Sequence, residues 1–273
     1  MTTDFVTVTE IAGDEVAQEQ VDRLCNRYYW AGKYCTDKDV VEVACGTGQG
    51  LRYLSSIARS FEAGDYSEEI LSIVYRHYGS SIKIQYFDAQ NMPFANKTKD
   101  VIILFEAIYY LPDVEQFIKE CLRILRSGGK VLICTANKNL YDFNPSPYSY
   151  KYYGVVELRD LFHKYGFETE FFGDTPLENV SLRQRVLRPI KKFAVLLRIV
   201  PKTTSGKKWL KRIVFGNLVR MPVEIGPPAI ENEEKIEEND IYRGKFVEPE
   251  SISDAEPNTN YKVIYCVATY HPD

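Results

Sequence analysis

Apolar and polar positions in the first 173 residues follow two alternating periods, one typical of helices and one typical of strands. Residues 14–34 carry apolar side chains at helical spacing, and after a polar turn the apolar run at 40–44 predicts a buried strand. Strands and helices that alternate in this way predict an α/β fold with a doubly wound, mostly parallel sheet covered on both faces. The further expected strands are 61–65, 82–88, 100–105, 129–136 and 167–172, and the further expected helices are 51–58, 67–78, 113–125 and 155–166.

The composition changes after residue 173, where this alternation stops. Residues 183–220 hold twelve Lys or Arg and no Asp or Glu, in a sequence that favours helices. Residues 231–260 are acidic and poor in large apolar residues, which is typical of an exposed loop, whereas 261–270 has high β propensity. We therefore expect three parts, which are a core domain of residues 1–173 plus 261–273, a basic helical insertion at 174–230 and an acidic loop or linker at 231–260.

The totals of the chain limit its class. Its 273 residues, 45% of them hydrophobic, suffice for one large domain or two small ones. The net charge of −4 argues against a surface devoted to nucleic acid. Because there is no basic start with an apolar segment and no apolar run of about 18 residues, we expect a cytoplasmic protein. Six cysteines without a CxxC pair and three histidines without ligand spacing predict neither disulfides nor a metal site.

A glycine-rich turn follows the first core strand in VVEVACGTGQG, residues 40–50. Gly46 and Gly48 let the backbone turn sharply and approach a ligand closely, and the helix that follows offers free N–H groups. The spacing G-x-G-x-G differs from the G-x-G-x-x-G of nicotinamide dinucleotide sites, and such turns also occur for structural reasons alone. Asp65 ends the second strand, 19 residues after Gly46, where a carboxylate can accept hydrogen bonds from ribose hydroxyls.

Three further segments fit the same pattern: FDAQNMPF at the third strand, DVIILFEAIYYL across the fourth and RILRSGGKVLI before the fifth. With the glycine turn and Asp65, they make the chain resemble the class I S-adenosylmethionine-dependent methyltransferases over about residues 20–173 and the final strand. The resemblance implies a seven-stranded sheet of order 3-2-1-4-5-7-6, with residues 261–270 as the antiparallel seventh strand. It also implies S-adenosyl-L-methionine as cofactor and S-adenosyl-L-homocysteine as its product.

Several residues fall on positions that bind the cofactor in this family. By the resemblance, Glu42 orients the amino group of the cofactor and Asp65 binds its ribose. Asp88 and Ala89 then bind the adenine, while Ala44 stands where many members have glycine. Turn or helix-capping roles are the alternative for both aspartates. The cofactor contacts that the resemblance implies are Arg27, Tyr29, Glu42, Ala44, Gly46, Gly48, Asp65, Tyr66, Asp88, Ala89, Phe105 and Glu106.

Relatives often cover the cofactor with a helix that precedes the first strand, which in this chain is residues 14–34. We expect Arg27 to pair with the carboxylate of the cofactor. We expect Tyr29 to lie over the sulfonium, since aromatic faces attract cations. An aromatic helix face packed on the sheet is the alternative.

We expect the loops after the fourth and fifth strands to contact the acceptor of the methyl group. Methyl transfer depends largely on holding donor and acceptor in line, but an alcohol acceptor also needs a base. The many tyrosines and amides in the second loop suit a polar ring such as a sugar, and loop packing accounts for them equally well. The candidate catalytic residues in these loops are Glu106, Tyr109, Asp142 and Tyr150.

The basic segment at 183–220 bears on the partners of the chain. Its charge suits a small-molecule acceptor that is anionic or lipid-linked, and peripheral contact with the inner face of an anionic membrane, whereas a solvated helical cap is the alternative. Nucleic acid is disfavoured by the net charge. Whole segments, including DFNPSPYSYKYYGVVEL, also resemble methyltransferases associated with bacterial surface-polysaccharide synthesis.

Several functions therefore stay open at this point. The first is an O-methyltransferase acting on a hydroxyl of a sugar or glycoconjugate. An N-methyltransferase acting on an amino sugar or another small amine is the alternative within the enzyme class. A non-catalytic module that binds a cofactor or a partner on the same fold is the alternative outside that class.

Overall fold

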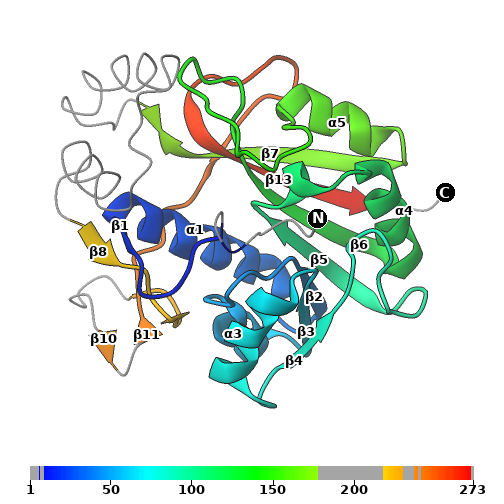
Figure 1. Cartoon of the computed structure of the whole chain (residues 1–273). Helices are drawn as coiled ribbons and strands as arrows, with labels where there is room; N and C mark the ends of the chain where they lie inside the picture. The colour runs from blue at the N-terminus through cyan, green and yellow to red at the C-terminus, as the bar shows by residue number, and fades with distance from the viewer. Residues whose placement is uncertain (1–5, 7–8, 178–217, 230–236, 239–240, 272–273) are drawn as a thin grey trace.

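The computed structural model describes residues 6, 9–177, 218–229, 237–238 and 241–271. Its main sheet has eight strands, with β2 at the centre between β3 and β5, all three parallel (Figure 1). From one edge to the other the strands are β12 (Glu250–Ser251), β7 (Phe167–Pro176), β13 (Tyr261–Tyr270), β6 (Leu125–Ala136), β5 (Lys99–Phe105), β2 (Asp39–Val43), β3 (Ser60–Asp65) and β4 (Lys83–Tyr86).

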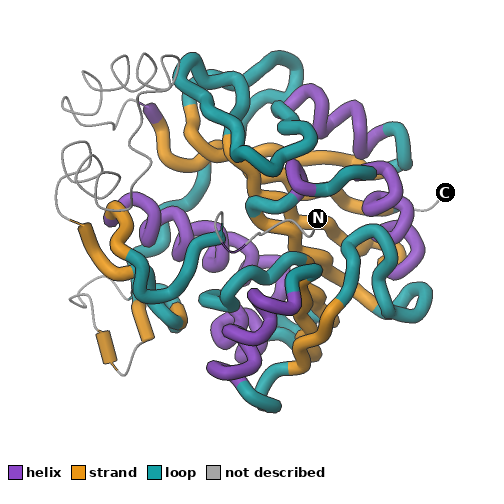
Figure 2. The backbone as a smooth tube through the Cα atoms, in the orientation of Figure 1, coloured by secondary structure: helices purple, strands orange, loops and turns teal. Residues whose placement is uncertain are grey.

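Helices cover both faces of this sheet, as Figure 2 shows in purple. Side chains of β2 alternate between the two faces because successive residues of a strand point in opposite directions. Val41 and Val43 pack with the residues of one face, and Val40 packs with those of the other. On the first face lie α4 (Val114–Ile124) and α5 (Val155–His163), and on the second lie α1 (Gln18–Cys35), α2 (Leu51–Ile57) and α3 (Glu68–Tyr78).

The sheet differs from the expected seven strands by one. Strand β13 lies antiparallel between β6 and β7, and β12 adds an eighth strand by pairing Glu250 with Gly173 and Ser251 with Phe172. This extra strand belongs to the segment expected to be an acidic loop or linker. Phe246 of the same segment packs edge-on against Tyr29 of α1. This aromatic contact helps to hold the segment against the core despite its polar composition.

Most of the expected basic insertion, residues 178–217, lies outside the described residues. Its first residues belong to β7, so the expected boundary at 174 falls inside a strand. Where the chain is described again, β8 (Leu218–Arg220) pairs antiparallel with β1 (Glu15–Ala17), and a second small sheet joins β9 (Glu224–Ile225), β11 (Ile241–Tyr242) and β10 (Glu237–Glu238). Among the described helices, none has the length and apolar character needed to cross a bilayer.

A buried carboxylate of the small sheet contacts the neighbouring helices. Glu224 of β9 forms ion pairs with Arg52 of α2 and with His77 of α3, the latter at 2.6 Å. The N–H of Ile225 also donates to the carbonyl of Gln49 at 2.9 Å. These contacts join the chain that follows the insertion to the helix that follows the glycine turn.

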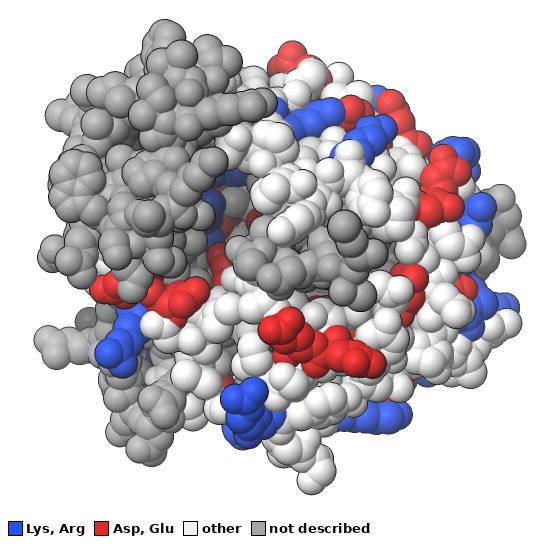
Figure 3. Space-filling model, in the orientation of Figure 1, with Lys and Arg blue, Asp and Glu red and all other residues white. Residues whose placement is uncertain are grey.

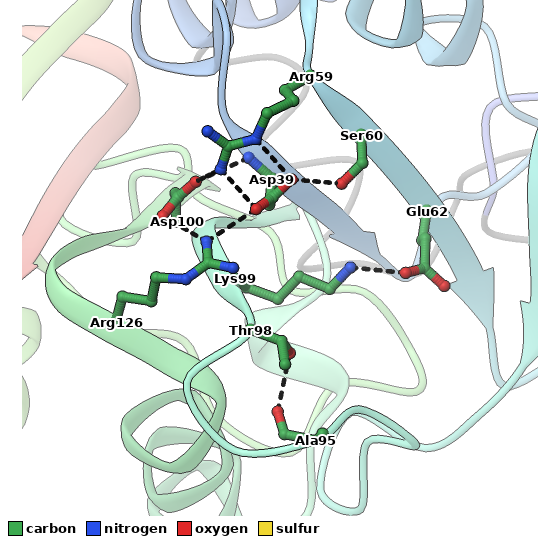
Figure 4. A network of polar contacts seen from close by, with 9 residues as sticks. All are labelled: Asp39, Arg59, Ser60, Glu62, Ala95, Thr98, Lys99, Asp100 and Arg126. Carbon is green, nitrogen blue, oxygen red and sulfur yellow. Dashed lines mark hydrogen bonds and ion pairs between the residues drawn. The ribbon is translucent and has the colours of Figure 1, made fainter.

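A network of two acidic and two basic residues joins the amino ends of the central strands (Figure 4). Asp39 at the start of β2 and Asp100 of β5 both accept from Arg126 of β6, at 2.8 and 2.7 Å. Arg59, just before β3, donates to the same two carboxylates. The N–H of Asp39 also donates to Asp100 at 2.9 Å. The network therefore links four adjacent strands at the edge opposite their carboxyl ends.

We expect Asp39→Asn to lower the free energy of unfolding by about 1–2 kcal/mol at pH 7. The Arg59 guanidinium holds the pKa of Asp39 well below its usual range, so this stability is present above the unfolded pKa of about 4 and is lost as the pH falls toward the folded pKa. Denaturant unfolding at pH 7 and pH 3.5 measures the effect. The matched control is Asp37→Asn, an exposed position with φ 58°, which asparagine tolerates. Equal losses in both variants would contradict the network's contribution.

Candidate active site

A cavity of about 620 Å³ lies at the carboxyl ends of the parallel strands. Its floor comes from the residues that end β2, β3, β5 and β6, and part of its wall comes from α1 and the segment before it. In Figure 3, basic and acidic atoms are visible within a hollow of this face. Ligands of doubly wound sheets bind at this edge, so the cavity lies where the fold class expects a site.

Most of the residues expected from the sequence line this cavity. They come from α1, from the ends of three parallel strands and from the loops that follow the strands, which meet at one edge of the sheet. The expected residues that line the cavity are Arg27, Glu42, Ala44, Gly46, Asp65, Tyr66, Asp88, Ala89, Phe105, Glu106, Tyr109 and Tyr150.

Tyr29 does not line the cavity, contrary to the expectation that it covers a sulfonium. Its hydroxyl accepts from the N–H of Gly244 at 3.1 Å, and its ring packs edge-on against Tyr53 at 5.4 Å. Successive residues of a helix point about 100° apart, so the helix that turns Tyr29 toward the core turns Tyr28 into the cavity. This packing favours the alternative of an aromatic helix face for Tyr29.

Gly48 and Asp142 also lie outside the cavity lining. Gly48 has φ +85°, and a Cβ there would come within 3.0 Å of Leu51 and 3.1 Å of Tyr78, so this glycine allows the turn to pack on its own helices. Asp142 lies in the loop after β6, whose first residue, Asn137, donates to the carbonyls of Asn258 and Tyr261. These bonds tie the start of the loop to the C-terminal segment.

Glu42 is a buried carboxyl that faces the cavity from the central strand. Its Oε1 accepts from the hydroxyl of Tyr28 at 2.6 Å. Its Oε2 is buried and has no hydrogen-bond partner within the described part of the chain. Burial raises the pKa of Glu42 to about 7, despite the hydrogen bond from Tyr28 and the nearby charge of Arg27. An unpartnered buried oxygen of this kind fits a ligand that carries an N–H donor or a positive charge.

The glycine turn is held by Asp65, which ends β3. The Oδ2 of Asp65 accepts from the N–H of Gly46 at 3.1 Å, and Oδ1 accepts from the N–H of Ser67 at 3.0 Å. Burial nevertheless raises the pKa of Asp65. Each carboxylate oxygen has a second lone pair, so the turn and a ligand can share this side chain. Ala44 has φ +54°, a left-handed conformation that costs about 1 kcal/mol relative to glycine, so the departure from the family's glycine has a small cost.

Glu106 directly follows β5 and is another carboxyl of the cavity lining with an unusual environment. Its backbone has φ +50°, and its Oε2 accepts from the hydroxyl of Tyr109 at 3.0 Å. Burial raises the pKa of Glu106, and the charge of Arg27 opposes this. The carbonyl of Tyr109 accepts from the N–H of Tyr150 at 2.8 Å, which joins the loop after β6 to this part of the cavity.

No sequence pattern indicated that the segment before α1 contributes to the cavity. Thr9 and Glu10 line the cavity, and the Glu10 carboxylate forms an ion pair with Arg27 at 2.8 Å. The carbonyl of Glu10 also accepts from the side chains of Thr47 and Gln49, at 2.8 and 2.9 Å. Arg27 therefore faces the cavity as expected, but it is paired with a carboxylate of the chain itself.

Comparisons with known proteins agree with this geometry. Residues 41–133 match the methyltransferase domain family. This part of the chain is therefore similar to S-adenosylmethionine-dependent methyltransferase domains. The match covers the glycine turn and the strands that form the floor of the cavity, β2 through most of β6.

Individual relatives extend the match beyond the domain. A "probable S-adenosylmethionine-dependent methyltransferase" of Mycolicibacterium smegmatis is 31% identical over 167 residues, which are 56% of this chain and 65% of that relative. A "fatty-acid O-methyltransferase" of the same organism is 34% identical over 105 residues, 36% of this chain and 37% of that relative. The chain thus spans less than two thirds of the length of these curated relatives.

A solved structure shares the fold over nearly the whole chain. The YcgJ protein of Bacillus subtilis superposes with a TM-score of 0.55, at 12% identity, covering 93% of this chain and all of that one. At this identity the likeness concerns the fold. The solved structure thus supports the fold, whereas the similarity to methyltransferases rests on the sequence matches.

We expect Glu42→Gln to remove much of the pH dependence of the free energy of unfolding of the protein. Because the folded pKa of Glu42 is raised to about 7, ionising it disfavours the folded state increasingly as the pH rises from the unfolded pKa of about 4.3 toward 7, and fully above that. Between pH 5 and pH 8 the variant should gain about 2 kcal/mol of unfolding free energy relative to the original chain.

Denaturant unfolding of the ligand-free protein at both pH values measures this gain. Glu168→Gln, whose side chain is 84% exposed, is the control. Identical pH profiles for Glu42→Gln and the original chain would show that the buried carboxyl does not titrate in this range.

Proposed function

We propose that this chain transfers a methyl group from S-adenosylmethionine to a hydroxyl of a small acceptor that contains a ring, with a sugar or glycoconjugate as one candidate. The observation that carries the proposal is the partly buried carboxyl of Glu106 at the cavity wall, hydrogen-bonded to Tyr109. A hydroxyl acceptor needs a base and a neutral amine does not. The name of the fatty-acid O-methyltransferase relative also favours oxygen as the acceptor atom.

The cofactor would occupy the end of the cavity above β2 and β3. In this proposal Asp65 accepts from the ribose hydroxyls, and Asp88 with Ala89 binds the adenine. The free Oε2 of Glu42 accepts from the amino group of the cofactor, which satisfies the orphaned oxygen. Tyr28 takes the position on α1 that was expected for Tyr29.

The bound cofactor supplies a methyl group activated by a positively charged sulfur. Glu106 would accept the proton of the acceptor hydroxyl, while the cofactor would supply the methyl group and keep the electron pair of its carbon–sulfur bond. Burial makes Glu106 a stronger base than an exposed carboxylate because it raises the pKa. Tyr109 holds the carboxylate in one orientation through its hydrogen bond.

The side chains of the cavity wall beyond Glu106 indicate which kind of acceptor would fit. This wall contains the rings of Tyr109, Tyr110 and Tyr150 with the apolar side chains of Leu111 and Pro112. Such a wall packs against the apolar face of a ring, in a sugar or in an aromatic compound. The amides of the loop after β6, which favoured a sugar in the sequence, contribute less than expected, since Asn137 is engaged with the backbone. The anionic or lipid-linked acceptor, the peripheral membrane contact and the surface-polysaccharide role stay predictions from the sequence.

N-methylation of a small amine is the second candidate within the same site. A neutral amine can attack the methyl carbon without a base, so a carboxyl placed at the cavity as a base favours the hydroxyl. A panel of hydroxylated and aminated ring compounds, with labelled methyl transfer as readout, separates the two.

Cofactor binding is the first test. We expect S-adenosylmethionine and S-adenosylhomocysteine to bind the full chain in calorimetric titration, and Asp65→Ala to weaken both by at least about tenfold because it loses the ribose acceptor. Asp65→Asn keeps one acceptor for the glycine turn and guards against misfolding as the cause. The exposed Asp160→Ala is the control. A well-folded chain that binds neither compound would refute the enzyme and leave a partner-binding module.

The role of Glu106 is tested by its amide. With a hydroxyl acceptor from the panel, we expect Glu106→Gln to lower kcat by about 100-fold or more, the size typical of a lost general base, with cofactor affinity within about threefold. The rise of activity with pH that reflects ionisation of Glu106 should disappear with it. Tyr109→Phe should have a smaller effect on kcat. A variant that keeps full activity and its pH profile would exclude Glu106 as the base.

A further inference from the structure

Two arginines one helical turn apart on α1 face the cavity, and they differ in their partners. Arg27 is paired with Glu10 at 2.8 Å, and its Nε is buried without a hydrogen-bond partner in the described residues. Arg23 lines the same cavity, yet no hydrogen bond or ion pair joins it to any residue that the structure describes. Residues four apart on a helix share a face, so the two guanidinium groups bring donors to one side of the cavity.

The charges of the two arginines act on overlapping groups of the site, and of the two only that of Arg27 acts on Glu42. Burial is the main influence that raises the pKa of Glu42 and of Glu106, and the charge of Arg27 lowers both. The charge of Arg23 acts against the raised pKa of Glu106 and of the Cys134 thiol. Arg23 is therefore associated with the ends of β5 and β6, where the proposed acceptor lies, rather than with β2 and the proposed cofactor end.

A guanidinium in this setting has a specific chemical use. Arginine is always charged and presents a planar fork of donors that matches a carboxylate or a phosphate. An arginine that was present only to balance Glu106 would form an ion pair with it, but no such pair exists within 4.0 Å. The tyrosine rings and apolar side chains of the lining supply no cation and Arg27 is paired with Glu10, so Arg23 is a cavity-lining cation that can bind an anion.

We propose that Arg23 binds an anionic group, a carboxylate or a phosphate, carried by the ring-containing acceptor. The inference rests on the proposed function, since it assigns a substrate class to the same site. Arg23 is then a specificity residue, which selects acidic acceptors over their neutral analogues and orients them so that the hydroxyl faces Glu106. The acceptor is accordingly a hydroxylated acid or phosphate ester with an apolar ring face.

The test compares charged and neutral probes of the same ring. Benzoate, phenyl phosphate and neutral benzamide are titrated by ligand-observed NMR into the full chain saturated with S-adenosylhomocysteine. We expect benzoate or phenyl phosphate to bind at least about fivefold more tightly than benzamide, and whichever anion binds more tightly identifies the preferred group. Arg23→Gln should weaken the anion by about tenfold and leave benzamide unchanged, whereas Arg23→Lys should retain part of the preference.

Arg76→Gln, on an exposed position of α3, makes the same change in charge away from the cavity and should keep the preference. The inference is overturned if the three probes bind equally or not at all, or if the preference survives Arg23→Gln. It is also overturned if Arg23→Gln shifts only the pH dependence of methyl transfer, because Arg23 would then act on Glu106 alone. Binding of S-adenosylhomocysteine is measured first and separately, so a failed cofactor site is distinguished from a failed anion site.

Discussion

The hydrogen bond between Tyr28 and Glu42 joins the two elements on which the site depends, the covering helix and the central strand. The ring of Tyr28 lies so close to the glycine turn that a Cβ on Gly50 would come within 2.1 Å of it. It also packs edge-on against Phe105 at 5.5 Å. One side chain thus fixes the distance between α1, the turn and the end of β5. Because of this contact, the cavity has a wall of constant position above the strand ends.

Several acidic side chains line the cavity at positions that are largely shielded from solvent. Glu42 and Asp65 are buried and Glu106 is partly buried at this cavity, and desolvation raises the pKa of each. Taking carboxylates out of water without full pairing costs free energy, so the ligand-free site is strained electrostatically. A cofactor that carries positive charge on its sulfur and its amino group would relieve that strain. The same burial that disfavours the empty site thereby favours the right ligand and the basicity of Glu106.

Much of this arrangement follows from local sequence patterns. The strand at 40–44, the glycine turn and the aspartate that ends the next strand were predictable because short-range periodicity and turn chemistry determine them. Which side of α1 turns toward the cavity was not predictable, because a shift by one residue exchanges Tyr28 for Tyr29 and both are aromatic. Glu10 and the strand at 250–251 were also missed, because they join the core through contacts distant in sequence and carry no periodic signal. Arg23 has no motif around it and becomes visible only as a cavity-facing side chain.

The ion-pair network around Asp39 and the ligand cavity lie at opposite ends of the same parallel strands. Residues that keep the strands in register are thereby separated from residues that meet ligands. Substitutions around the acceptor wall can then accumulate without loosening the sheet, and the fold tolerates changes of substrate that a site built into its own stabilising contacts would not. Divergence of acceptors within one architecture is the evolutionary counterpart of this division.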